Sequence, residues 1–395
     1  MTENTDVVVI GGGYAGVMAA NRLTKRDDVT VTLINPRPNF VERIRLHQLV
    51  GGSDDAVVDY REVLGEGVRL VVDSATRIDA AARSVTMATG GTVGYDYLIY
   101  AVGSGSADPR VPGAAELAYS IADLEAAERL RRVLEAASAT AAVTVVGAGP
   151  TGIETAAELA EQGRRVTLAC GGPLGPYLHP RVRRSVAKRL AKLGVTVLEG
   201  ADAKVTAVTR DTVRLSGGHT LSSAVTIWTA GFGVPDLAAN SGLSTDTVGR
   251  LLTDETLTSV DDERIVAAGD SAAPSDLPFR MSCQAAVQLG PQAAETVLSR
   301  LKGEQPAPID AGFAGQCISL GRRVGIFQFA SKDDTANRYH LGGRPGAKLK
   351  EFVCKSTVRQ LANEARNPGS RNVWLKDDKR RQLLQDRRVE APARH

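Results

Sequence analysis

The chain has 395 residues, of which 43% are hydrophobic, and a formal net charge of +3, so it can form two or three domains with separate cores. No segment approaches the roughly 18 consecutive apolar residues of a membrane-spanning helix, and the polar start "MTENTD" is not a secretory signal. The cysteines stand far apart, at Cys170, Cys283, Cys317 and Cys354. This spacing argues against a metal site and a dithiol motif, and it predicts a reduced, cytoplasmic protein.

The first predicted unit starts with the apolar run "DVVVI" at residues 6–10, which is typical of a parallel strand buried on both faces. Glycines with the spacing G-x-G-x-x-G follow, at Gly11, Gly13 and Gly16. Such glycines allow a tight turn, let the backbone approach a pyrophosphate and let a helix pack on the strand, with the helix N-terminus facing the phosphates. The next strand ends at Asn35, where an acidic residue usually binds the adenosine ribose and an amide can bond the same hydroxyls. We predict a dinucleotide site, with a purely structural turn as the alternative.

A further strand is predicted in "YDYLIYAVGS", residues 95–104. It runs into a turn of small residues, Ala101, Val102 and Gly103, where the backbone could lie close to a bound cofactor. An ordinary strand end is the alternative.

The second unit, residues 144–170, is built to the same plan as the first. The glycine spacing recurs, at Gly147, Gly149 and Gly152. Glu154 and Glu158 follow on the predicted helix, and the second strand ends at Cys170. Two complete units imply two dinucleotides, of which one is usually a bound flavin and the other a diffusible nicotinamide. A degenerate duplicate that binds nothing is the alternative.

A short strand in "RIVAAGDSA", residues 264–272, ends at Gly269 and Asp270. An acidic residue at such a strand end can bind a chain of hydroxyl groups. Here too an ordinary strand end is the alternative.

Over about residues 7–303 the chain resembles the two-dinucleotide flavoprotein reductases, and within them the type II NADH dehydrogenases and apoptosis-inducing-factor-like quinone reductases. The resemblance rests on five motifs in this order: "IGGGYAG", "YDYLIYAVGS", "VVGAGPTGIETAAE", "TIWTAGF" and "RIVAAGDSA". It implies FAD at the first unit, with Asp270 on its ribityl or pyrophosphate part. It also implies NAD(P)H at the second unit, with Glu154 close to the nicotinamide.

Other segments gain candidate roles from the resemblance. Gln284 and Gln288 in "SCQAAVQLG" match positions beside the flavin ring, where their amides could bond flavin carbonyls or a quinone oxygen; polar residues on a surface helix are the alternative. Arg43, Arg45 and His47 are candidates for the acceptor side of the flavin, against simple surface charges. The residues expected to bind a cofactor are Gly11, Gly13, Gly16, Asn35, Arg43, Ala101, Val102, Gly103, Gly147, Gly149, Gly152, Cys170, Gly231, Gly269 and Asp270.

The sequence departs from the family pattern near the flavin and at the end of the second unit. It has no dithiol like that of thioredoxin and glutathione reductases, which argues against disulfide reduction. Cys170 replaces the acidic residue that accepts the NADH ribose, so a 2′-phosphate is not repelled. Guanidinium groups suit phosphate, and several stand nearby in sequence, at Arg164, Arg165, Arg181, Arg183 and Arg184. We therefore expect NADPH to be used at least as well as NADH, with a solvated helix face as the alternative meaning of these arginines.

The C-terminal region differs from that of membrane-bound relatives. From Leu341 onward it contains 14 Lys/Arg and 6 Asp/Glu residues, a balance of +8. A helix is predicted over 348–366, with an apolar stripe of Leu349, Phe352, Val353 and Leu361 that we expect to pack on the protein or a second subunit in preference to lipid. The remaining basic tail is too charged for a confident anchor, although a peripheral membrane contact stays open.

The predicted fold is α/β, with two Rossmann-like three-layer dinucleotide-binding domains, the second inserted in the first, and a C-terminal α+β region. We predict an FAD domain at 1–112 and 250–315, an NAD(P)H domain at 113–249, and an acceptor or dimer region at 316–395.

The predicted enzyme passes a hydride from NAD(P)H to FAD and then electrons to a quinone or quinone-like small molecule, without a metal or nucleic-acid partner. The alternatives are a flavin-dependent oxidase or tailoring enzyme, a ferredoxin-type reductase docked by the basic tail, and an NAD(P)H-sensing flavoprotein that changes its dimerisation.

Overall fold

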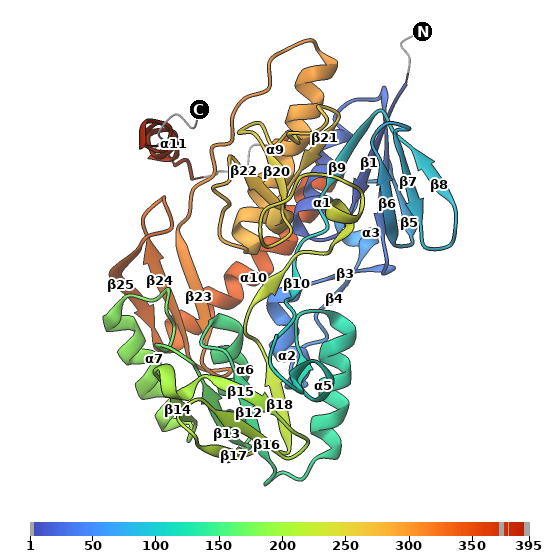
Figure 1. The fold of residues 1–395 in the computed structure, drawn as a ribbon. Helices are drawn as coiled ribbons and strands as arrows, with labels where there is room; N and C mark the ends of the chain where they lie inside the picture. Colours follow the sequence, from blue (N-terminus) through green and yellow to red (C-terminus); the bar gives the residue numbers. More distant parts are fainter. Residues whose placement is uncertain (1–3, 371–374, 378, 391–395) are drawn as a thin grey trace.

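The structure is a computed structural model that describes residues 4–370, 375–377 and 379–390; the other tail positions, including Trp374, lie outside the described residues. Two five-stranded parallel sheets organise the fold, one in the upper and one in the lower half of Figure 1. The first has the order β21-β9-β1-β2-β5. Its strands are β1 (Thr5–Ile10), β2 (Val29–Asn35), β5 (Val68–Val72), β9 (Tyr97–Tyr100) and β21 (Ile265–Ala267).

Strand β1 shows why its sequence is a continuous apolar run. Val7 and Val9 pack into the core beneath the helices α1 and α9, whereas Val8 and Ile10 face the core beneath a small antiparallel sheet. Both faces of the parallel sheet are therefore covered, which makes a three-layer domain. The covering elements are α1 (Tyr14–Leu23), α9 (Cys283–Leu301), β6 (Ala75–Asp79), β7 (Ser84–Met87) and β8 (Thr92–Gly94).

The second sheet repeats this plan in the order β11-β18-β12-β13-β14. Its strands are β11 (Tyr119–Ser120), β12 (Ala142–Val146), β13 (Arg165–Ala169), β14 (Thr196–Leu198) and β18 (Val225–Trp228). It is covered by α5 (Leu124–Ala136), α6 (Pro150–Glu161), α7 (Pro180–Lys192), β15 (Val205–Val208), β16 (Thr212–Leu215) and β17 (Thr220–Ser222). The predicted class, α/β with two Rossmann-like units, is confirmed. The first sheet takes its strands from two stretches of chain on either side of the second; the domain limits stay a prediction.

Short elements connect these layers. The strands β10 and β19 pair antiparallel where the chain passes between the two sheets (Figure 1). The remaining short elements are β3 (Asn39–Val41), η1 (Arg43–Arg45), α2 (Leu46–Val50), β4 (Val57–Asp59), α3 (Tyr60–Val63), β10 (Gly105–Ser106), α4 (Ala114–Leu117), η2 (Ala201–Ala203), β19 (Phe232–Gly233), α8 (Leu237–Asn240), β20 (Leu251–Thr253), η3 (Gly269–Ser271) and β22 (Ala272–Pro274).

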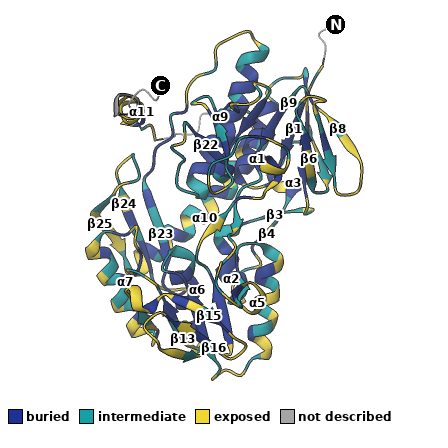
Figure 2. Cartoon of the chain, viewed as in Figure 1, coloured by how far each residue is buried: buried dark blue, intermediate teal, exposed yellow. Residues whose placement is uncertain are grey.

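The C-terminal region forms an antiparallel sheet and two helices. They are β23 (Gly315–Ser319), β24 (Gly325–Ala330), β25 (Ala336–Gly342), α10 (Gly343–Arg366) and α11 (Lys379–Glu390). Figure 2 shows the strands of both parallel sheets as a buried layer, while α11 is largely exposed. Within the described residues no helix combines the length and apolarity needed to cross a membrane.

The buried face of α10 differs from the predicted stripe. Leu361 is buried as expected, but Phe352 is 59% exposed, and Leu349 and Val353 are only half-buried. The buried face instead includes Lys350 and Cys354. Packing of the stripe on this chain therefore holds for Leu361 and in part for Leu349 and Val353, and its packing on a second subunit stays a prediction; the burial of Lys350 against a carboxylate on α6 was not predicted.

Candidate functional site

The first glycine turn has the geometry that its spacing predicts. Gly11 has a φ of 102°, and a Cβ atom there would overlap the carbonyl oxygen of Ala101. A Cβ on Gly16 would overlap the carbonyl oxygen of Gly11, so only glycine lets α1 approach the strand. Gly13 is the N-cap of α1, and a Cβ atom on it would meet no protein atom within 4 Å. The turn therefore leaves room beside the helix N-terminus, where phosphate binds favourably.

Asn35 lies at the end of β2 beside this turn, where it was predicted. Its Oδ1 accepts a hydrogen bond from the Gly12 amide at 2.9 Å, and its Nδ2 donates to the Arg37 carbonyl at 2.8 Å. The Tyr60 hydroxyl donates to the Gly12 carbonyl at 2.8 Å. The Asn35 amide thus holds the loop itself in position, a role that its place in the sequence did not reveal.

The turn after β9 joins the same site. Ala101 and Val102 lie against Gly11, and Gly103 has a φ of 71° and open space beside it. Gly269, with a φ of 72°, packs closely on Ala15 of α1 and so brings Asp270 next to the first glycine turn.

Asp270 is the centre of a small polar cluster. Its Oδ2 accepts from the Ser104 hydroxyl at 2.7 Å, and its Oδ1 accepts from the Ser282 amide at 3.0 Å. The Arg43 guanidinium donates to the Ser104 hydroxyl at 3.1 Å and lies 3.8 Å from the Asp270 carboxylate. Residues from four distant segments therefore meet where the resemblance expects the flavin.

Arg45 and His47 lie away from this cluster. Arg45 is buried and its guanidinium contacts the carboxylates of Glu42, Asp54 and Glu351. Burial lowers the pKa of Arg45, but its hydrogen bond to Glu351 and the nearby Glu42 and Cys354 more than offset this and raise it. The ion pair with Glu351 therefore links η1 to α10.

The two glutamines of α9 clamp the segment before β23. Gln288 donates from Nε2 to the Gly312 carbonyl at 3.0 Å and to the Gln284 carbonyl at 2.8 Å. In the amide orientation that satisfies hydrogen bonding, Gln284 donates to the Gly315 carbonyl at 3.0 Å and accepts from the Ala314 amide at 2.9 Å. The Oε1 atom of Gln288 is buried and has no partner among the described residues.

The second glycine turn repeats the close approaches of the first. Gly147 has a φ of 128° and abuts Thr229 after β18, and a Cβ on Gly152 would overlap the Gly147 carbonyl. Gly149 is the N-cap of α6 and, like Gly13, faces open space. Gly231, with a φ of 84°, follows Thr229 and packs near Ala107 at the crossing between the sheets.

Glu154 of α6 is held by the C-terminal region. Its Oε1 forms an ion pair with Lys350 of α10 and accepts from the Ser319 amide at 2.9 Å, and its Oε2 lies 3.7 Å from His47 Nδ1. Sequence reasoning missed Lys350, because a lysine on an amphipathic helix carries no signal of burial. Burial lowers the pKa of Lys350, but the Glu154 carboxylate more than compensates and raises it, so the ammonium stays charged.

His47 is a neutral member of this cluster. Burial lowers its pKa well below the ordinary value, and the charges of Lys350, Arg322 and Arg45 lower it further. Its Nε2 atom has no hydrogen-bond partner among the described residues.

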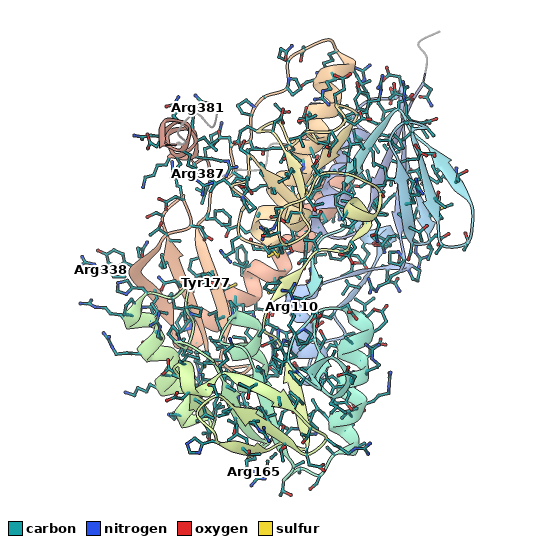
Figure 3. The ribbon with its side chains drawn as sticks, in the orientation of Figure 1. Arg110, Arg165, Tyr177, Arg338, Arg381 and Arg387 are labelled. Atoms are coloured by element: carbon teal, nitrogen blue, oxygen red, sulfur yellow. The ribbon has the colours of Figure 1, made fainter. Side chains whose placement is uncertain are left out.

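Cys170 follows β13 at the same edge of the second sheet as the glycine turn. Burial raises the pKa of its thiol to about 12, and the nearby Glu199 adds to this, so the thiol carries no charge. Arg165 is the first residue of β13 and lies at the outer, lower end of the domain in Figure 3, roughly 16 Å from Cys170 at about 3.3 Å per residue. Arg164 donates to the Leu134 carbonyl. Arg165 is therefore near Cys170 in sequence but far from it in space, because the two residues stand at opposite ends of one strand. Arg181, Arg183 and Arg184 lie in the first turns of α7.

The residues present fit a dinucleotide at each turn. Gly13 and Gly149 leave space next to a helix N-terminus, and each neighbouring glycine is required by a close backbone approach. In the first unit the Tyr14 hydroxyl is buried without a partner among the described residues, as is Gln288 Oε1, which leaves polar atoms for a bound group. No group of three or more potential metal ligands occurs in the part of the chain that the structure describes.

Comparison with known proteins agrees with this geometry. Residues 5–295 match the pyridine nucleotide-disulphide oxidoreductase family. The chain is 33% identical to an NADH dehydrogenase-like protein of Mycobacterium tuberculosis over 329 residues, which are 75% of this chain and 81% of that protein. It is 30% identical to the type II NADH:quinone oxidoreductase Ndh of the same organism over 346 residues, 76% of this chain and 74% of the relative.

Solved structures share the fold. The sulfide:quinone oxidoreductase of Aquifex aeolicus matches with a TM-score of 0.78 at 21% identity and covers 97% of this chain and 95% of its own. NDH2 of Plasmodium falciparum in complex with NADH matches with a TM-score of 0.77 at 18% identity, covering 92% and 97%. The predicted resemblance to type II NADH dehydrogenases is confirmed. The chain is an oxidoreductase enzyme that belongs to the pyridine nucleotide-disulphide oxidoreductase family, which combines FAD with a pyridine nucleotide.

Proposed function

We propose that the protein takes a hydride from NAD(P)H onto FAD and delivers electrons to a quinone or quinone-like small molecule. The observation that carries the proposal is the pair of matching glycine turns, each with its central glycine facing open space beside a helix N-terminus. The relatives named type II NADH:quinone oxidoreductase support the choice of acceptor.

In this proposal the first turn and the Asp270 cluster hold FAD, which when bound accepts a hydride and passes electrons on. Gly11, Gly13 and Gly16 approach the pyrophosphate, and the turn Ala101–Gly103 lines the cofactor. Asp270 is already oriented by the Ser104 hydroxyl and the Ser282 amide, so its free lone pairs can bind hydroxyl groups without reorganisation. Arg43 supplies positive charge at the same place.

The second turn and Glu154 hold the nicotinamide nucleotide. Gly147, Gly149 and Gly152 approach its pyrophosphate. Glu154 is fixed by Lys350 and the Ser319 amide, so the carboxylate has one defined position when the nucleotide arrives. The proton of the pair resides on Lys350 Nζ, because the Glu154 carboxylate raises the pKa of that ammonium.

Gln284 and Gln288 orient the segment before β23 on the acceptor side in this proposal. Both amides bond the backbone of residues 312–315, and Gln288 Oε1 remains for a bound group. The two glutamines would thus act by holding residues 312–315 in place, the segment that an acceptor would contact.

We also propose that NADPH is used at least as well as NADH. Cys170 carries a neutral thiol where a carboxylate would repel a 2′-phosphate, and Arg181, Arg183 and Arg184 lie in the first turns of α7, the helix that follows β13 in the chain. Glu199 near Cys170 acts against this preference.

The decisive experiment is anaerobic stopped-flow mixing of the purified holoprotein with NADPH and with NADH, followed by flavin absorbance. Rapid bleaching by at least one nucleotide, followed by reoxidation with a water-soluble quinone, is expected. A flavin that neither nucleotide bleaches would overturn the hydride-transfer proposal. Fast reoxidation of the flavin by oxygen but by no quinone would overturn the proposal of a quinone acceptor.

A further inference from the structure

A cavity of about 310 Å³ lies outside both glycine turns, between the β23–β24 turn, the start of α10 and helix α2. Helix α10 lies beside β23 and β24 in Figure 1. The cavity is lined by Gln48, Ser319, Arg322, Arg323, Arg344, Ala347, Lys348, Lys350 and Glu351. Most of its α10 residues share one face of the helix, at i, i+3, i+4 and i+7, which is separate from the buried face that packs on the core.

The rim of this cavity carries four cationic side chains, of which only Arg322 lies near enough to carboxylates of the described residues, those of Glu158 and Glu351, for its charge to favour their ionised forms. Arg322, Arg323, Arg344 and Lys348 are exposed, and none forms an ion pair with a carboxylate of residues 4–370, 375–377 or 379–390. Arg344 and Lys348 stand four residues apart on α10, an arrangement in which like charges destabilise a helix. Uncompensated like charges gathered around a hollow are the arrangement expected of an anion site.

The floor is partly buried, since the Glu351 side chain is 36% exposed, and its charges are already paired. Lys350 is bound to Glu154, and Glu351 lies 3.0 Å from Arg45. Gln48 is also buried and contributes a polar amide. The start of α10 adds partial positive charge, because its N-cap Gly342 provides no side-chain cap for the first amides. The net charge offered to a ligand is therefore that of the four rim cations.

We propose that this cavity binds a small soluble molecule carrying two phosphate groups, such as the diphosphate part of a nucleotide or another diphosphorylated metabolite. Three of the four rim cations are arginines, whose planar guanidinium groups form paired hydrogen bonds with phosphate oxygens. The hollow with its polar floor suits a compact ligand better than a flat membrane surface. The cavity lies outside both glycine turns, although Ser319 and Lys350 on its floor also contact Glu154.

The test is isothermal titration calorimetry of inorganic pyrophosphate into the full-length holoprotein at low ionic strength without divalent cations. Excess NAD⁺ keeps pyrophosphate out of the second glycine turn. The double variant Arg322→Gln/Arg344→Gln removes two rim cations, and Arg77→Gln removes an exposed arginine from β6 in the other domain as the matched control. We expect one site per chain, weaker by at least tenfold in the double variant and unchanged in Arg77→Gln.

Folding of the double variant is checked by thermal unfolding without ligand. The two removed charges have no ion-pair partners among the described residues, and Arg322 interacts only at longer range with Glu158 and Glu351, so the melting temperature should change little. Equal pyrophosphate affinity in the double variant and the wild type would overturn the proposal, as would absence of binding to the wild type. If the wild type binds phosphatidylglycerol vesicles through these arginines but does not bind pyrophosphate, the soluble ligand is excluded and the cavity is a membrane contact.

Discussion

The two dinucleotide units share a turn but differ in everything that surrounds it. Gly12 in the first turn corresponds to Ala148 in the second. A Cβ on Gly12 would overlap the Tyr60 hydroxyl, which together with Asn35 ties the loop through side chains. Ala148 is tied instead by a backbone bond from Gly175 at 3.0 Å. The glycine spacing thus sets the phosphate turn, while long-range neighbours decide how tightly each loop is enclosed.

The helices of the two units differ in the same way. Met18 of α1 lies in the apolar core, whereas Glu154 stands at the matching position of α6 and pairs with Lys350. One turn later, Arg22 of α1 pairs with the buried Glu364 at the other end of α10. Helix α10 therefore binds one unit through its first half and the other through its second half, with opposite charges.

The largest effect is expected from a variant that breaks one of the two ion pairs of α10, the pair between Lys350 and Glu154. Lys350→Met leaves Glu154 buried without its cation, which should lower the free energy of unfolding by about 3–5 kcal/mol. The double variant Glu154→Gln/Lys350→Met should recover most of this loss, because no isolated charge remains. Urea unfolding measures both; if the double variant is as unstable as the single one, packing and not charge explains the anchor.

The next largest effects are expected from substitution of the central glycine of each turn, which should affect the two cofactor sites separately. Gly149→Ala meets no protein atom, so it should cost less than about 1 kcal/mol of stability. Its methyl group should crowd the nucleotide, and a cost of about 1–3 kcal/mol weakens binding of NAD(P)H about 5- to 150-fold. Gly13→Ala should lower flavin content instead. Flavin absorbance per chain and KM for the nucleotide distinguish them, and identical behaviour of the two variants would contradict separate sites.

The stability of the Glu154 cluster should depend on pH through His47, which lies beside Glu154. The matching position of the first unit is the apolar Met18, which does not titrate. The pKa of His47 is lowered in the folded protein, so below the ordinary value of 6.5 the unfolded chain binds a proton that the native protein does not. Stability from this group is complete above pH 6.5 and falls with pH by up to about 1.4 kcal/mol per unit. Between about pH 7 and pH 5, urea unfolding should show a larger loss of unfolding free energy for the wild type than for His47→Gln. If the two proteins lose the same free energy, groups other than His47 cause the pH dependence.

The smallest expected effect concerns the residue that ends the second strand of each unit. Cys170→Asp places a carboxylate beside the ribose, and repulsion of a 2′-phosphate of about 1 kcal/mol should raise the NADH-to-NADPH ratio of kcat/KM about 5- to 10-fold. Arg165→Gln, at the other end of β13, is the matched control and should leave the ratio unchanged. If Cys170→Asp leaves the ratio unchanged, Cys170 does not contribute to the choice between NADH and NADPH.

The sequence alone determined the two glycine turns, the buried strands before them and the position of Asp270 at a strand end. These features depend on local stereochemistry: a glycine with positive φ, a close backbone contact within the same turn, or a continuous apolar run. The family followed from their order along the chain.

Only the tertiary structure decided the rest. Lys350 and Glu154 are 196 residues apart, and no local pattern predicts that they pair or that a lysine of α10 is buried. Arg165 is near Cys170 in sequence and far from it in space, while the four rim cations of the cavity come from two segments that meet only in the fold. Backbone turns are set by a few adjacent residues, but the energy of a buried charge depends on partners that the whole fold must bring to it.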